Sequence, residues 1–344
     1  MTRVTLKQVA AEAGVSVPTV SLVLNDRPAR VSDETRERIH KAARSLRYVG
    51  NQVARNLRKG STSTIGVIVP DIANEFYAEL AKGIERACSE RGWKMILTSS
   101  DNHASREAEY IDELYARSVD GIILANAPDD GKLFTQNMDY LDSFGMPYVL
   151  LDRSGEGRGS AVTGDHLFGG REATRHLLDL GHRKIACITG PMFFEGTQSR
   201  VQGYKQALED VGEKFNPSLI YECDYTFESA LKIARAMDMG KFTAVFAFND
   251  LMALAFIKAA KEQGFVIPID RSVIGYDDMP FNRFISPGLT TMRQPLIQMG
   301  SDAATIIISA IDESQDDTSE QHTVLKVFRP RLIIRSSTAP PTIL

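Results

Sequence analysis

Apolar runs of strand length alternate with helical patterns along most of the chain. Four runs lie at residues 65–69, 95–97, 121–124 and 148–151, and four more at 184–188, 219–221, 244–248 and 273–276. Short apolar runs that are each followed by an amphipathic stretch are typical of parallel strands joined by crossover helices. Two such cycles contain more residues than one compact core can hold. The pattern therefore predicts two α/β lobes with doubly wound parallel sheets.

The order of the two cycles predicts where each lobe begins and ends. We expect the first lobe to contain residues 63–162 and about 293–322, and the second to contain residues 163–292 and about 323–344. Ligands of such sheets bind at the carboxyl ends of the strands. The cleft between the lobes is therefore the expected ligand site.

The start of the chain has a different pattern, with apolar residues at helical spacing and clear signals for helix ends. Thr5 and Gln8 form a capping box for a helix that begins near residue 6, and Gly14 suits a tight turn. Ser16 caps a second helix, and a third follows from Ser32. Two short helices joined by a Gly-containing turn predict a helix-turn-helix head over residues 1–49 that reads a DNA major groove.

The distribution of charge favours nucleic acid as the partner of this head. Residues 1–60 carry twelve Lys and Arg against five Asp and Glu, a net charge of +7, whereas the remainder carries 28 against 39, a net charge of −11. A basic head on an acidic body is what attraction to phosphates at one end would require. The pI of about 5.9 for the whole chain conceals this division.

Three segments of the head resemble the lactose-repressor (LacI/GalR) family. Residues 5–25 read TLKQVAAEAGVSVPTVSLVLN, residues 31–39 read VSDETRERI and residues 54–58 read ARNLR, and the resemblance continues to about Ile334. It implies an effector-controlled transcriptional regulator, a repressor that binds a palindromic operator as a homodimer. It also implies a periplasmic-binding-protein-like core. The VSLVL phrase at residues 20–24 is most similar to the maltose-system branch of the family.

The resemblance implies which side chains of the head touch DNA. Base-reading side chains would project from Val17, Pro18 and Leu22, and the other predicted contacts in the head are Thr5, Thr19, Ser21, Asn25, Arg27 and Arg30. Leu22 stands where Arg is frequent in the family, so the usual bidentate contact with guanine is missing there. We therefore expect apolar contact with thymine methyl groups.

Residues 50–62 correspond to the family's hinge helix and linker. Within this segment Asn51 can cap a short helix that extends through Leu57. Seven residues cannot hold a helix alone, because helix nucleation is costly. The resemblance implies that this segment folds on DNA, with Ala54 and Leu57 in the minor groove and Leu57 wedged between base pairs. Gly50 replaces the family's frequent Pro just before it.

Strand ends of the core supply aromatic and polar side chains that match effector-binding positions of the family. They are Phe76, Tyr77, Asp152, Phe194, Arg200, Tyr225, Asn249, Asp277 and Gln294. Arginine and carboxylates hydrogen-bond hydroxyl groups, and aromatic rings cover the C–H face of a sugar, so a neutral sugar is the leading effector. A corepressor of the nucleoside, purine or sugar-phosphate class is the alternative. His166 occupies a position where Asn is common.

Other function classes find little support in the sequence. It has no P-loop lysine motif, no His-Glu-x-x-His pair and no Gly-x-Ser-x-Gly elbow, so we expect no catalytic residues and no cofactor. The three cysteines, Cys88, Cys187 and Cys223, lack metal-ligand spacing and suit buried thiols in a reducing compartment. A secreted sugar-binding protein would need an export signal, and the first 30 residues contain no suitable apolar run. We expect a cytoplasmic protein without a membrane segment.

The expected oligomer is a two-fold dimer, because one head covers one half of a near-palindromic site. The tail after Arg335 contains no apolar heptads, so no tetramer-forming zipper is expected.

Overall fold

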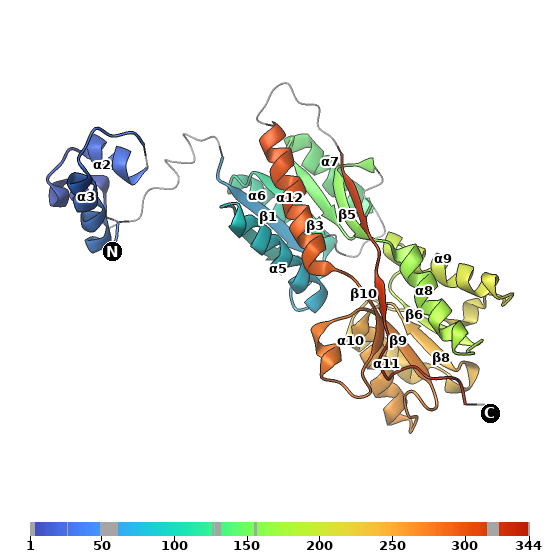
Figure 1. Cartoon of the computed structure of the whole chain (residues 1–344). Helices are drawn as coiled ribbons and strands as arrows, with labels where there is room; N and C mark the ends of the chain where they lie inside the picture. Colours follow the sequence, from blue (N-terminus) through green and yellow to red (C-terminus); the bar gives the residue numbers. More distant parts are fainter. Residues whose placement is uncertain are drawn as a thin grey trace. The chain divides into compact units, whose positions relative to one another are not determined.

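The computed structural model describes residues 4–25, 27–48, 61–125, 127, 132–154, 157–314 and 323–342. Its internal contacts divide the chain into two units, Met1–Thr62 and Ser63–Leu344 (Figure 1). Each unit has its own core.

Among its described residues, the first unit has the helices α1 (Leu6–Ala13), α2 (Val17–Leu24) and α3 (Asp33–Ser45). The backbone N–H of Thr5 donates to Gln8 Oε1 at 2.8 Å, and Gly14 ends α1 with a φ of 64°, as the sequence predicts. Fully buried aliphatic side chains from all three helices form the core: Val9, Val20, Val23 and Ile39. The predicted helix-turn-helix head is confirmed.

The first lobe of the second unit is a six-stranded parallel sheet covered by helices on both faces. Its strands run in the order β11-β5-β4-β3-β1-β2. They are β1 (Thr64–Val69), β2 (Lys94–Ser99), β3 (Gly121–Ala125), β4 (Tyr148–Leu151), β5 (Ser160–Gly164) and β11 (Leu325–Phe328). Helices α5 (Glu75–Glu90) and α12 (Leu296–Ser314) cover one face, and α6 (Ala104–Ala116) and α7 (Lys132–Phe144) cover the other. Because both faces are buried, the inner strands are apolar throughout.

The second lobe repeats this architecture, with strand order β12-β10-β9-β8-β6-β7. Its strands are β6 (Ile185–Thr189), β7 (Ile220–Glu222), β8 (Ala244–Ala247), β9 (Ser272–Asp277), β10 (Thr290–Arg293) and β12 (Arg331–Ile333). Its helices are α8 (His166–Asp179), α9 (Glu195–Asp210), α10 (Phe227–Ala236) and α11 (Asp250–Glu262), with short 3₁₀ turns at Pro217–Leu219, Met239–Lys241 and Pro280–Arg283. Among the described strands of this sheet, the edge strand β12 alone runs antiparallel, against β10.

The chain passes between the lobes three times: after β5, after β10, and between β11 and β12. The predicted boundaries are wrong at the third crossing, because they place all of residues 323–344 in the second lobe. Strand β11 joins the first lobe as an edge strand, parallel to β5 with Leu325 opposite Ala161. Leu325 is 56% exposed, so the strand lacks the burial that would have marked it as part of a sheet.

The last described residues run along the second lobe. The Oγ of fully buried Ser337 donates to the carbonyl of Val273 at 2.6 Å and accepts from the backbone N–H of Thr290 at 2.8 Å. Across the ranges given above, none of the helices has both the length and the apolar character that crossing a bilayer would need.

Candidate effector cavity and DNA-binding head

A cavity of about 220 Å³ lies where the carboxyl ends of strands from the two lobes face one another. Eight of the nine predicted effector residues line it: Phe76, Tyr77, Asp152, Phe194, Arg200, Tyr225, Asn249 and Asp277. Residues far apart in the sequence meet here because each follows a strand of its sheet or begins the next helix. The structure therefore brings almost the whole predicted set together.

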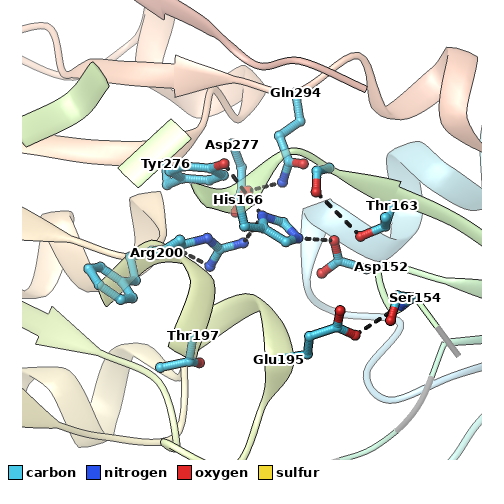
Figure 2. A network of polar contacts seen from close by, with 12 residues as sticks. Asp152, Ser154, Thr163, His166, Glu195, Thr197, Arg200, Tyr276, Asp277 and Gln294 are labelled. Atoms are coloured by element: carbon cyan, nitrogen blue, oxygen red, sulfur yellow. Dashed lines mark hydrogen bonds and ion pairs between the residues drawn. The ribbon is translucent and has the colours of Figure 1, made fainter. Parts of the chain in front are cut away.

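Arg200 is the central cation of this cavity, although it is only 4% exposed. Its Nη1 donates to the carbonyl of Phe248 at 3.0 Å, and its Nη2 lies 3.2 Å from Nδ1 of His166 (Figure 2). The guanidinium stacks 4.2 Å from the centre of the Tyr276 ring. Burial lowers the pKa of Arg200, but the tyrosines and carboxylates around it raise it above its ordinary value. In the described part of the chain its buried Nε has no hydrogen-bond partner.

Three residues of the cavity have a left-handed backbone that side chains other than glycine rarely adopt. The φ angle is 58° at Asp152, 68° at Tyr225 and 105° at Asp277. Such strain persists where the surrounding structure enforces it, and it clusters at binding sites. Around Tyr225, a Cβ at Gly190 would lie 1.9 Å from the ring, so the strand end must leave this space open. The backbone strain therefore supports a binding role for Asp152, Tyr225 and Asp277.

Gln294 does not line the cavity, contrary to the sequence-based expectation. Its Nε2 donates to Asp277 Oδ1 at 2.8 Å, so it lies behind Asp277 and supports that carboxylate. The reason is the passage from β10 to α12, which places Gln294 between the lobes and buries it.

Several lining residues were not predicted from the sequence. They lie in loops of both lobes and at the start of α10: Asp71, Asn74, Asn102, Asp224, Thr226, Phe227 and Glu228. Asn74 could have been found, because it caps α5 by accepting from the backbone N–H of Phe76 at 3.1 Å, just as Asn249 caps α11. The others lie in loops, or in the first turn of α10 that follows such a loop, and the sequence pattern does not specify the path of these loops.

Asp277 should make stability depend on pH. Burial raises its pKa to about 7, although Arg200 and Gln294 oppose the shift. An unfolded aspartate ionises near pH 4. Between these values the folded state holds a proton that the unfolded state has lost, so stability falls as pH rises from about 4 to 7. Asp277→Asn should flatten this slope in urea unfolding measured from pH 5 to pH 8. An unchanged slope would show that Asp277 ionises normally.

The exposed face of α2 presents the predicted base-reading side chains. Val17 is 38% and Leu22 36% exposed, and Pro18 is exposed beside them. Thr5, Arg27 and Arg30 are exposed too, whereas Thr19, Ser21 and Asn25 are half-buried. Leu22 is therefore not part of the core of the head. The predicted hinge contacts Ala54 and Leu57 lie outside the described residues.

The three cysteines lie in the apolar cores of the two lobes. Cys88, Cys187 and Cys223 are free and buried, and burial raises the pKa of Cys88 and of Cys223 to about 11. No group of His, Cys, Asp and Glu suited to a metal ion occurs among the residues whose placement is described.

Comparison with known proteins covers both units. Residues 5–51 match the family described as bacterial regulatory proteins, lacI family, and residues 62–329 match periplasmic binding proteins and sugar binding domain of LacI family. The chain is 35% identical to the transcriptional regulator DegA of Bacillus subtilis (strain 168), over 98% of this chain and 99% of DegA. It is 34% identical to the transcriptional repressor PurR of Vibrio vulnificus (strain CMCP6), over 97% and 98% of the two chains.

Solved structures agree with these sequence matches. A complex of the regulator CelR with cellobiose has a TM-score of 0.70 at 33% identity and covers 97% of this chain and 100% of CelR. The lac repressor dimer bound to operator and the anti-inducer ONPF has a TM-score of 0.84 at 27% identity, covering 98% and 100%. With both its head and its core matched, the chain belongs to the LacI family of DNA-binding transcriptional regulators, which are not enzymes.

Proposed function

We propose that this protein is a repressor that binds a palindromic operator as a homodimer and responds to a neutral sugar bound between the lobes. The observation that carries the proposal is the buried guanidinium of Arg200, whose unpartnered Nε belongs to a side chain that lines the cavity. A buried donor without an acceptor is costly, and a ligand oxygen would remove that cost. The aromatic rings of Phe76 and Phe194 line the same cavity and can cover the C–H face of a sugar.

The charge of the cavity favours a neutral ligand over a phosphorylated one. Among the described residues that line it, five carboxyl groups, those of Asp71, Asp152, Asp224, Glu228 and Asp277, face the two guanidiniums of Arg153 and Arg200. Four carboxylates remain even when Asp277, whose pKa burial raises to about 7, is protonated. Arg153 stacks 3.5 Å from the centre of the Phe134 ring, and Arg200 already donates to protein groups. An anion would therefore meet net negative charge, whereas hydroxyl groups can donate to the carboxylates.

A purine or nucleoside is the second candidate. The aromatic side chains of the cavity could also stack on a flat base. The similarity to a repressor named PurR favours this class. The resemblance to the maltose-system branch remains a prediction and puts maltose among the sugars to be tested.

A thermal-shift screen, followed by calorimetry, separates these candidates. The panel contains glucose, ribose, maltose and cellobiose, their available phosphates, and purines with their nucleosides. We expect at least one neutral sugar to raise the midpoint of unfolding and its phosphate to have no effect. Stabilisation by a purine alone would favour the second candidate, and stabilisation by sugar phosphates alone would contradict the charge argument.

The exposed Leu22 should make operator recognition depend on thymine. Val17, Pro18 and Leu22 add no hydrogen-bond donors to the exposed face of α2, so apolar contact with thymine methyl groups is the direct readout available to them. Selection from random duplexes should yield half-sites with a fixed thymine. A mismatched base pair in a site costs about 1–3 kcal/mol, and Leu22→Ala should remove most of this discrimination at the thymine. A guanine requirement that is lost in Leu22→Ala would contradict the assignment.

We also infer the face through which two copies associate. Phe284 is 86% exposed, and the next residue, Ile285, lines a groove of about 570 Å³ together with Leu254, Ile257 and Pro287 of the same lobe. Lys258, Lys261 and Glu262 line the same groove beside these apolar residues. Under two-fold symmetry, each copy can insert its aromatic ring into the apolar part of the groove of the other. Aromatic residues of this kind dominate the energy of interfaces.

Phe284→Arg should therefore separate the dimer. Light scattering should give twice 38.0 kDa for the wild type and 38.0 kDa for the variant at the same concentration. Val211→Arg, at an exposed apolar residue just after α9, is the matched control and should remain dimeric. A dimeric Phe284→Arg would exclude this face, and four chains in the wild type would contradict the expectation from the tail.

A further inference from the structure

His166 bridges the two lobes directly behind the cavity. It is the first residue of α8 in the second lobe and is 5% exposed. Its Nε2 lies 2.9 Å from Oδ1 of Asp152, which follows β4 of the first lobe. Its Nδ1 lies 3.2 Å from Nη2 of Arg200 on α9 (Figure 2). One imidazole ring thus joins a carboxylate of one lobe to the guanidinium of the other.

These contacts specify how the ring carries its proton. A guanidinium nitrogen can only donate, so Nδ1 of His166 must accept from Arg200. The proton of a neutral imidazole then lies on Nε2, which donates to Asp152. The hydroxyl of Tyr276 lies 3.4 Å from Nδ1 and approaches the same acceptor. A proton on Nδ1 would point at a donor, so the neutral ring with hydrogen on Nε2 satisfies both neighbours.

The ring is also held sterically. A Cβ at Gly196 would lie 3.1 Å from Cδ2 of His166, and a Cβ at Gly164 would lie 3.0 Å from its Cε1. Both glycines leave just enough space for the imidazole, and Gly196 lines the cavity itself. The ring therefore has little freedom to turn away from its two partners.

We propose that His166 is a positioning residue for the effector, which orients Asp152 and Arg200 together for binding. His166 does not line the cavity, whereas both of its partners do. The contact with Oδ1 orients the carboxylate of Asp152 so that Oδ2 can accept from a ligand, and the contact with Nη2 orients the guanidinium of Arg200, whose Nε has no partner among the described residues. One acceptor and one donor fixed by the same ring suit a hydroxyl-rich neutral ligand, so this inference rests on the proposed function.

The test compares four variants by calorimetry with the neutral sugars of the panel. His166→Gln can reproduce both contacts, because its amide nitrogen can donate to Asp152 and its oxygen can accept from Arg200. We expect it to bind within about threefold of the wild type. His166→Ala removes both contacts and should bind about 10- to 100-fold more weakly, with the shorter His166→Asn between them. His176→Ala is the control for general destabilisation. His176 does not line the cavity, and its Nε2 lies 3.0 Å from Oγ1 of Thr338.

A second measurement does not depend on any ligand. In full-length protein with ¹⁵N-labelled histidine, the signal that disappears in His166→Gln should have the shifts of a neutral ring protonated at Nε2. A proton on Nδ1, or a charged ring at neutral pH, would overturn the proposal. Wild-type affinity in His166→Ala would overturn it as well. If no panel compound binds the wild type, the proposed function fails, and the protonation of His166 still decides whether the bridge exists.

Discussion

Arg200→Ala is expected to abolish the response to effector while the protein still binds bare operator. The side chain donates to protein carbonyl and hydroxyl groups around the cavity, and its buried Nε has no hydrogen-bond partner among the described residues. Hydrogen bonds to charged groups contribute about 1.5–3 kcal/mol each, so losing the one that Nε would make with a ligand would weaken binding by about 10- to 150-fold. The measurement is calorimetry with the sugar that binds the wild type, beside operator binding with and without that sugar.

Two further variants separate this effect from misfolding. Arg200→Lys keeps the charge but loses the planar set of donors, and it should also bind poorly. Arg171→Ala removes an exposed arginine of α8 that pairs with Asp210 at 2.7 Å, and it should behave as the wild type. Loss of operator binding together with effector binding in Arg200→Ala would indicate a folding defect. Undiminished effector affinity would place the ligand elsewhere.

Operator binding by the full chain is expected to depend steeply on salt. The first 60 residues have a net charge of +7, and Arg27 and Arg30 are exposed on the head. If six to ten phosphates are bound, affinity should fall by about 10³ to 10⁵ between 50 and 200 mM salt. The logarithm of the affinity should fall linearly with the logarithm of the salt concentration. Arg27→Ala or Arg30→Ala should make this slope shallower by about one unit for each phosphate that the variant no longer neutralises.

The control for this measurement is an unrelated duplex of the same length, which should bind more weakly with a comparable slope. Affinity that barely changes with salt would mean that the basic head does not bind phosphates. The chain would then function through its core alone, as a ligand-binding protein without DNA.

The sequence predicts the elements well because each buries its apolar residues in a regular pattern. The capping box at Thr5 and the turn at Gly14 lie where they were expected, and so do eight of the twelve described strands. The predicted runs leave out β5 and β10, although both are largely buried. Strand β11 was assigned to the wrong lobe. It lies two residues before β12, and only pairing with distant β5 separates the two. Such long-range pairing leaves little trace in a short, exposed strand.

The candidate site was predictable where it follows strand ends, and less so elsewhere. Asp152, Asn249 and Asp277 were found because each directly follows or ends a buried apolar strand. The supporting role of Gln294 and the bridge made by His166 depend on how two lobes meet. No local pattern in the sequence specifies that contact. Asp224 in the loop before α10 and Glu228 in the first turn of that helix line the cavity for the same reason.

The central claim is that ligand in the cleft controls the affinity of the head for DNA. Fluorescence anisotropy tests it directly, with full-length protein, a selected palindromic duplex, and increasing amounts of the sugar that binds the wild type. The account predicts a change in operator affinity of about 5- to 150-fold, which the Arg200→Ala variant does not show. An operator affinity that stays constant while the cavity fills with ligand would contradict the account.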